Sequence, residues 1–267
     1  SRTFYEVEEL KKYFPIRKGV LSKIVAQVRA VDGVTFEIMR GETLGLAGES
    51  GCGKTTLGRC LISLIPSTSG ELRYNGQDLL KMKKKDIQTI RRDMTMIFQD
   101  PYSSLNPRMT VADIVSEPLE NYRIARGSKK LEMVMELMEK VGMAPYHIYR
   151  YPHEFSGGQK ARIGIARAIA INPKFIIADE PVAALDVSVR ATILNLMKDI
   201  QKELNLTYLF ISHDLSVVKH ICDRVMIMYL GRIVEITKTE NLYSRPEHPY
   251  TQALMSAIPI PDPTVKR

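Results

Sequence analysis

Short apolar runs that end at glycine alternate with helical patterns along the first third of the chain. Strands are predicted over residues 28–38 and 43–47, which are rich in β-branched or apolar residues and are followed by Gly41 and Gly48. Leucine recurs at helical spacing from residue 54 to 65 and the pattern stops before Pro66, which predicts a helix there. Further strands are predicted over residues 71–74 and 94–99.

Helical patterns dominate between about residues 102 and 172. The clearest is a helix over 128–141, for which we predict Ser128 as the N-cap and Gly142 as the stop. The alternation then returns, with strands expected over 175–178, 208–211, 225–230 and 232–236 and a helix over 188–204. This order favours an α/β fold with a parallel sheet that a helical insertion interrupts. The proline-rich residues 241–267 look like an appended tail.

Composition narrows the class of protein. The chain has 267 residues, of which 45% are hydrophobic and 25% charged, as in an ordinary globular protein. The N-terminus carries charges where a signal peptide would need an apolar run, so we expect a cytosolic chain. Three cysteines without CxxC spacing argue against a disulfide framework or a zinc site. The net charge of +8 suits nucleic acid, an anionic membrane face or nucleotide phosphates, but no nucleic-acid-binding motif accompanies the short basic runs, which favours a solvated surface.

The sequence GESGCGKTT at residues 48–56 fits the GxxxxGK[ST] phosphate-loop pattern between a predicted strand and helix. Glycines let several backbone N–H groups face one phosphate, and the helix N-terminus adds its positive dipole end. Lys54 is expected to reach the terminal phosphates and the Thr55 hydroxyl to bind Mg²⁺. The competing interpretation is a glycine-rich turn that caps a helix. The expected nucleotide-binding residues of this loop are Gly48, Glu49, Ser50, Gly51, Cys52, Gly53, Lys54, Thr55 and Thr56.

Two further motifs carry candidate chemistry. FIIADE at residues 175–180 is an apolar strand that ends in two acids, so Asp179 is expected to hold Mg²⁺ and Glu180 to act as general base. FSGGQ at residues 155–159 opens a helix whose N-cap is Ser156, and it could be a second anion site. Ser156 lies 108 residues after Gly48, the first residue of the phosphate loop. A chain with two helix N-termini that face phosphate has either two anion-binding sites or one site that is shared between two copies of the chain.

The ordered set of motifs resembles that of ATP-binding cassette ATPases. It comprises the loop at 48–56, Gln99 after a strand, FSGGQ, FIIADEP, AALD at 183–186 and ISHD at 211–214, and it covers roughly residues 4–240. Phe155 and Ala183 replace a usual leucine and a common serine. The resemblance implies a P-loop NTPase core with a RecA-like parallel sheet, an N-terminal antiparallel β-subdomain and a helical subdomain inserted at approximately 100–172. Residues 1–240 would form the ATPase domain and residues 241–267 the C-terminal tail.

The resemblance also implies a composite site. In this family two domains dimerise head to tail, so that the signature residues of one copy face the γ-phosphate bound by the other. Asp186 would link the two sites across that dimer. The signature residues here are Ser156, Gly157, Gly158 and Gln159.

Three more roles follow from the resemblance alone. Gln99 would lie in the Mg²⁺ and water region, and His213 would contact the γ-phosphate and hold Glu180 in position. An N-terminal aromatic residue stacks on adenine in the family, and we prefer Phe14 to Tyr13 for that contact.

Narrower features resemble the ATPase subunits of oligopeptide and dipeptide importers. They are FQDPYSSLNPRMTV at 98–111, DEPVAALDVSVRATILNLM at 179–197 and, above all, RPEHPYTQALMSAIPIPDP at 245–263. The resemblance implies ATP and Mg²⁺ as cofactors and a peripheral position on the cytoplasmic face of the cell membrane. Its partners would be a second ATPase subunit, identical or paralogous, two membrane permease subunits and, indirectly, an extracellular solute-binding protein, with no nucleic acid.

Other functions stay open at this point. Nickel and oligosaccharide importers belong to the same group and would give the chain the same motor role. DNA-repair ATPases share the motifs but place long coiled coils between them, for which 108 residues leave no room. Translation-type cassette proteins normally carry two cassettes in one chain.

Overall fold

The computed structural model describes residues 3–99 and 107–258. Its centre is a six-stranded sheet in the order β10-β9-β3-β8-β7-β6, which is parallel except for β10. The strands are β3 (Thr43–Ala47), β6 (Met94–Ile97), β7 (Phe175–Asp179), β8 (Thr207–Ser212), β9 (Arg224–Tyr229) and β10 (Arg232–Lys238). All residues of β3, β7 and β8 are buried, as strands covered on both faces must be. The predicted P-loop NTPase core is confirmed.

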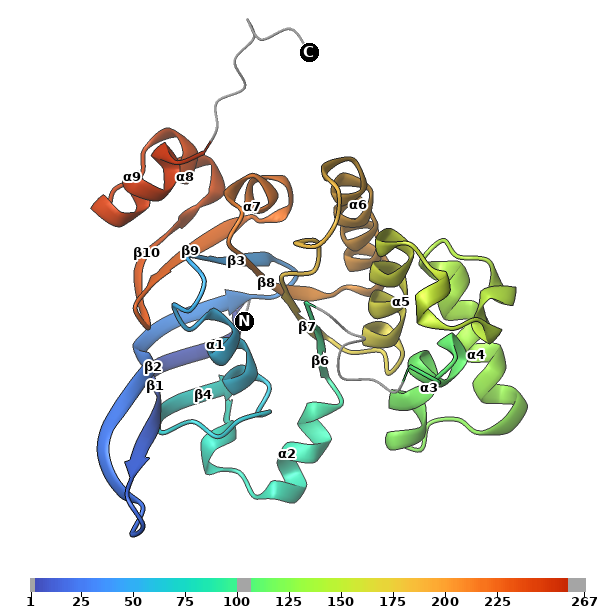
Figure 1. Ribbon diagram of the computed structural model, residues 1–267, viewed down its shortest axis with the longest axis horizontal. Helices are drawn as coiled ribbons and strands as arrows, with labels where there is room; N and C mark the ends of the chain where they lie inside the picture. Colours follow the sequence, from blue (N-terminus) through green and yellow to red (C-terminus); the bar gives the residue numbers. More distant parts are fainter. Residues whose placement is uncertain (1–2, 100–106, 259–267) are drawn as a thin grey trace, which may run out of the picture.

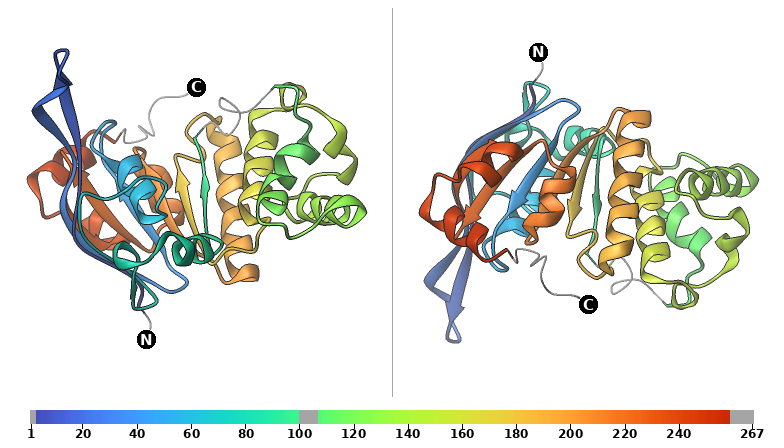
Figure 2. Two further views of the ribbon diagram at one scale, coloured as in Figure 1. Left: turned by 90° about the horizontal axis from the view of Figure 1, so that it is seen from below. Right: turned by 90° about the horizontal axis from the view of Figure 1, so that it is seen from above.

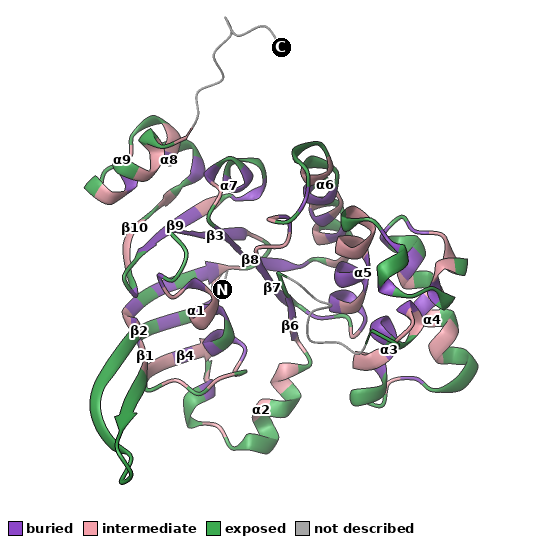
Figure 3. Ribbon diagram, viewed as in Figure 1, coloured by how far each residue is buried: buried purple, intermediate pink, exposed green. Residues whose placement is uncertain are grey.

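A second, antiparallel sheet has the order β2-β1-β4-β5. Its strands are β1 (Thr3–Lys18), β2 (Lys23–Met39), β4 (Ser69–Tyr74) and β5 (Gln77–Asp78). The prediction of a strand over 28–38 was too short, because β2 begins five residues earlier. Strand β1 was not predicted. The outer halves of β1 and β2 leave the sheet as a two-stranded arm, visible at the lower left of Figure 1 and exposed in Figure 3.

The two faces of the parallel sheet have separate cores, which follow from the two-residue period of a strand. Phe175 and Ile177 face a core shared with the antiparallel sheet and α1 (Lys54–Leu61), whereas Ile176 and Ala178 face the core of the helical side. Tyr5 and Phe175 meet at ring centroids 5.8 Å apart and join the two sheets. Helix α1 therefore lies between the two sheets, where it is held on several sides.

Helices cover the rest of the molecule. Helices α6 (Val187–Leu204) and α7 (Leu215–Ile221) pack on the core of the helical side, and α2 (Lys84–Arg91) precedes β6. Between β6 and β7 come α3 (Val111–Asn121), α4 (Gly127–Lys140), α5 (Gly157–Ile169) and the short 3-10 helices η2 (Pro145–Tyr149) and η3 (Pro152–Glu154). Figures 1 and 2 show these helices gathered at one end, with α5 between them and the sheet. In the described residues, no helix is both long and apolar enough to cross a bilayer.

Three sequence predictions need correction. The helix over 54–65 ends at Leu61, because Ser63 adopts a positive φ of 56°. Ser128 is not an N-cap: α4 begins at Gly127 after Arg126, which makes no side-chain cap, although Gly142 does end the helical segment with φ 76°. The tail is not merely appended, because α8 (Thr239–Ser244) and α9 (Pro249–Ser256) fold against the body of the protein.

Candidate nucleotide-binding site

The phosphate loop connects β3 to α1 and has no room for side chains at two glycines. A Cβ on Gly48 would lie 2.3 Å from the carbonyl oxygen of Met228, and one on Gly53 would lie 2.0 Å from that of Ala30. Gly53 also has φ 103°, a left-handed conformation that glycine adopts without strain. The loop is therefore held between β2 and β9 by close backbone contacts, which positions the N-terminus of α1.

That N-terminus is suited to an anion. Gly53 is the N-cap residue and provides no side chain to satisfy the first N–H groups of α1. Lys54 is only 6% exposed, and its Nζ donates to the carbonyl oxygens of Gly48 and Glu49 at 2.7 and 2.9 Å. The buried ammonium group is held by two neutral carbonyls, not by a carboxylate, so its positive charge is not neutralised. Together with the N-terminus of α1 it forms a concentrated positive site. The phosphates of a nucleotide fit this donor set.

An oxygen-rich position adjoins the phosphate loop. The Thr55 hydroxyl donates to the carboxylate of Asp179 at the end of β7, 3.1 and 3.2 Å from its two oxygens. Burial raises the pKa of Asp179, although the hydrogen bond from Thr55 opposes that shift. A hydroxyl beside a buried carboxylate is the hard-oxygen environment that Mg²⁺ prefers. The two residues therefore fit the predicted metal-binding role.

The predicted general base has a strained backbone and a defined partner. Glu180 follows β7 with φ 51°, a left-handed conformation uncommon for residues other than glycine. Its Oε1 accepts a hydrogen bond from the backbone N–H of His213 at 3.1 Å and lies 2.9 Å from His213 Nδ1. The Glu180 side chain is mostly buried, whereas that of His213 is 53% exposed. The ends of β7 and β8 thus bring these two residues together.

A cleft of about 500 Å³ joins the phosphate loop to Gln99 and Glu180, and this volume suits a nucleotide-sized ligand. Its wall also includes Val28, the β2 residue paired with Phe14 in register. Phe14 itself does not line the cleft. Tyr13, the other aromatic candidate, donates its hydroxyl to Asp32 at 2.5 Å, so it is already engaged.

The signature residues do not line this cleft in a single chain. Ser156 caps α5: its hydroxyl accepts from the Gln159 N–H at 3.3 Å, and the Gln159 side chain accepts from the Ser156 N–H at 3.0 Å. Gly157 and Gly158 approach Leu185 and Val189, leaving little space for a Cβ. Asp186, exposed, is the N-cap of α6 and makes no side-chain capping bond.

Tyr250 is a residue that sequence reasoning missed. It lies on α9, and its hydroxyl accepts a hydrogen bond from the backbone N–H of Glu49 in the phosphate loop at 3.2 Å. Its ring lies 4.5 Å from that of Tyr229 at the end of β9. His248 caps α9 by accepting a hydrogen bond from the Tyr250 N–H at 3.1 Å, so the first and last residues of the HPY sequence at 248–250 are joined. The C-terminal segment therefore touches the nucleotide-binding loop directly.

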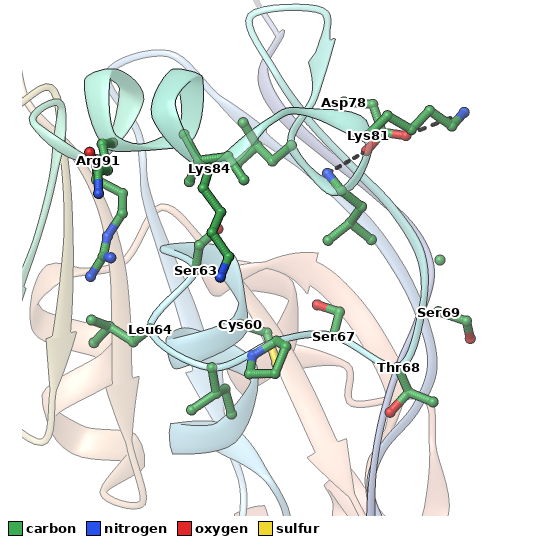
Figure 4. Close-up of a pocket in the computed structure, with 17 residues that line it drawn as sticks. Cys60, Ser63, Leu64, Ser67, Thr68, Ser69, Asp78, Lys81, Lys84 and Arg91 are labelled. Carbon is green, nitrogen blue, oxygen red and sulfur yellow. Dashed lines mark hydrogen bonds and ion pairs between the residues drawn. The ribbon is translucent and has the colours of Figure 1, made fainter.

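A larger cavity, about 670 Å³, lies away from the phosphate loop between the end of α1 and α2 (Figure 4). Buried Cys60 and the hydroxyl residues Ser63 and Ser67 line one side. The side chains of Lys84 and Arg91 extend from α2 toward it. It contains none of the motif residues, so it is separate from the nucleotide cleft.

Comparison with known proteins places this arrangement in a family. The sequence profile described as ABC transporter matches residues 31–183, more than half of the chain. The chain belongs to the ABC transporter family. A second profile, described as the C-terminal region of oligopeptide/dipeptide transporters, matches residues 234–267 of this ABC ATPase. The predicted family, ATPase activity and association with ATP are thereby confirmed.

Relatives and solved structures agree with the assignment. The ABC ATPase is 52% identical to the oligopeptide transport ATP-binding protein AppF of Bacillus subtilis, covering 97% of this chain and 79% of that one. It is 50% identical to OppF of Salmonella typhimurium, covering 100% and 80%. Among structures, the ATP-binding cassette MJ0796, a dimer in a post-hydrolysis state with ADP and Pi, matches with a TM-score of 0.76 at 27% identity, covering 88% of this chain and 98% of that one.

Proposed function

We propose that this ABC ATPase is the motor subunit of a membrane importer for di- and oligopeptides. The observation that carries the proposal is the C-terminal oligopeptide/dipeptide transporter match at residues 234–267, together with similarity to oligopeptide transport ATP-binding proteins over 97–100% of this chain. A glutathione import ATP-binding protein of Pectobacterium atrosepticum is 50% identical, covering 97% of this chain and 42% of that one. Glutathione is itself a short peptide, so this relative supports the same class of substrate.

Nucleotide hydrolysis would use the residues of the cleft. The α1 N-terminus and Lys54 bind and orient the phosphates, and Thr55 with Asp179 would hold Mg²⁺, which would neutralise phosphate charge. Glu180 accepts a proton from the attacking water, and the His213 backbone N–H, which donates to Glu180 Oε1, holds that carboxylate in place. The left-handed backbone at Glu180 directs the side chain to that contact.

The signature helix would complete the site from a second copy or a paralogue. Supporting this, Ser156 and Gly157 are exposed at the N-terminus of α5 yet do not line the cleft of their own chain. A head-to-tail dimer would place that N-terminus against the terminal phosphate, with Asp186 at the contact between the two sites.

The proposed assembly adds two permease subunits and, indirectly, a solute-binding protein, with the ATPase peripheral at the cytoplasmic face of the membrane. Cargo recognition would then belong to other subunits. Alternatives in DNA repair or translation are not favoured, because the relatives described above are named for oligopeptide transport or glutathione import.

Calorimetry of the isolated chain tests whether it binds nucleotide but leaves cargo binding to other subunits. We expect saturable binding of MgATP and no binding of a di- and tripeptide mixture, with or without ATP. Saturable micromolar peptide binding by the isolated chain would overturn the motor assignment.

A further inference from the structure

The positive charge of this ABC ATPase is concentrated in two segments. Residues 11–30 contain six basic and no acidic residues, and residues 81–92 contain six basic and one acidic residue. Together they carry a net charge of +11 whereas the whole chain carries +8, so all other residues sum to −3. We call these two segments the basic end. In Figure 1 both lie along the lower edge of the molecule, opposite α8 and α9.

The first segment forms the outer half of the β1–β2 arm, which buries little. Every residue from Phe14 to Lys18 and from Lys23 to Arg29 is exposed. The apolar residues among them, for example Ile16, Ile24 and Val25, are 40–55% exposed. A two-stranded ribbon with apolar side chains open to water has marginal stability by itself. Such a ribbon gains stability when another surface covers it.

The tip of the arm, Gly19–Ser22, is unusual for a turn. Gly19 accepts a hydrogen bond from the Ser22 N–H at 3.0 Å, and the two central residues are Val20 and Leu21. Central positions of turns normally carry glycine, asparagine or other polar residues. Here both are apolar, with relative exposures of 104% for Val20 and 80% for Leu21. The most prominent point of the arm is therefore a pair of apolar side chains.

The basic residues at the tip repel one another and so destabilise the free arm. Lys18 and Lys23 are direct partners across the two strands, and like charges in that position destabilise a sheet. In the described part of the chain, only Arg29 and Lys81 of the twelve basic residues pair with a carboxylate. Lys84 and Arg91, beside the cavity of Figure 4, have no acidic partner there. An external anionic surface would relieve this repulsion.

We propose that the basic end binds the anionic phospholipid headgroups of a membrane surface, with Val20 and Leu21 inserted at the headgroup–acyl boundary. Apolar side chains flanked by lysine and arginine are the combination that favours this interface. An acidic protein surface would match the charges but gives no reason for two strongly exposed apolar residues at the apex. The proposal rests on the proposed position of the ATPase at a membrane, and it adds which end of the molecule faces the lipid.

Flotation of the full chain with vesicles of phosphatidylcholine, with and without phosphatidylglycerol, tests the proposal. We expect binding only to the anionic vesicles, with release at high salt, because salt screens the attraction. Each basic residue near an anionic bilayer strengthens binding about fivefold, so Lys18→Glu with Lys23→Glu should weaken it at least about 25-fold. Val20→Ser with Leu21→Ser should weaken binding while leaving the charge unchanged.

The matched control is Lys202→Glu with Lys238→Glu, which changes the net charge equally at exposed positions outside the basic end. It should bind vesicles as the parent does, and all variants should bind MgATP normally. Failure of the parent chain to bind anionic vesicles, or equal loss in both charge-reversal pairs, would overturn the proposal. So would cross-linking of the tip to a permease subunit without lipid binding. None of these outcomes would alter peptide-stimulated hydrolysis, which tests the motor function separately.

Discussion

Removing one hydroxyl group should reveal whether the C-terminal segment positions the phosphate loop. In Tyr250→Phe the ring remains against Tyr229, but the Glu49 N–H loses its acceptor. A neutral hydrogen bond contributes about 1 kcal/mol, so the loop becomes less well organised for phosphates by at most that amount. We expect the KM for MgATP to rise up to about fivefold. The kcat should stay near the parental value, because Tyr250 contacts neither Glu180 nor His213.

Steady-state ATPase assays and thermal melts of the same samples measure both effects. The matched control is Tyr229→Phe, which keeps the stacked rings and whose hydroxyl makes no hydrogen bond to the described residues; it should change neither KM nor Tm. Losing about 1 kcal/mol should lower the Tm of Tyr250→Phe by about 2–4 °C. A lower Tm with an unchanged KM would refute the positioning role and leave a purely structural contact.

Other substitutions test the nucleotide site itself. Glu180→Gln should keep MgATP binding and trap a closed dimer while hydrolysis falls about 10²–10⁴-fold; parental turnover in a single-turnover assay would exclude Glu180 as the base. Lys54→Ala should weaken ATP binding measured by calorimetry, because it removes a charge-assisted phosphate contact, and unchanged affinity would contradict that role. Ser156→Arg should bind ATP as a monomer but fail to dimerise in sedimentation experiments, and full activity as a monomer would exclude the shared site. Because burial raises the pKa of Asp179, the folded chain holds that proton more tightly than the unfolded chain, and stability falls as pH rises above the ordinary carboxyl range. Asp179→Asn should therefore raise the Tm of the nucleotide-free protein at neutral pH and abolish the effect of Mg²⁺ on ATP affinity, whereas a lower Tm would contradict the cost of the buried charge.

Local patterns predicted the parallel sheet well because its strands are short, apolar and closed by glycine or acids. Strand β7 illustrates this, since FIIAD at residues 175–179 is buried throughout and ends at the site. Strand β1 could not be predicted from the pattern, because its apolar positions do not alternate with polar ones. Phe4 and Tyr5 are adjacent and both buried. The register of the pairing with β2 shifts at several places, and at one of them Glu9 has a positive φ of 44°. Irregular pairing of this kind depends on the partner strand.

In the nucleotide site too, residues within one motif could be predicted from their spacing, whereas contacts between distant segments could not. The GxxxxGK[ST] spacing places backbone N–H groups, Lys54 and Thr55 by itself, so a single segment was enough to predict them. The contact of Tyr250 with Glu49 joins residues 201 positions apart, and nothing local to the HPY sequence indicates it. The sequence could have suggested only that the hydroxyl of a half-buried tyrosine usually finds a hydrogen-bond partner.

Peptide-dependent ATP hydrolysis in a reconstituted importer tests the proposed function most directly. The chain would be assembled in proteoliposomes with its membrane subunits, its partner ATPase and a solute-binding protein loaded with a tripeptide, and phosphate release would be measured. We expect stimulation by the peptide-loaded protein, loss of that stimulation in Glu180→Gln, and no response to peptide alone. Equal rates with empty and peptide-loaded binding protein would contradict the peptide-import motor, and stimulation by a sugar-loaded protein instead would contradict the choice of cargo.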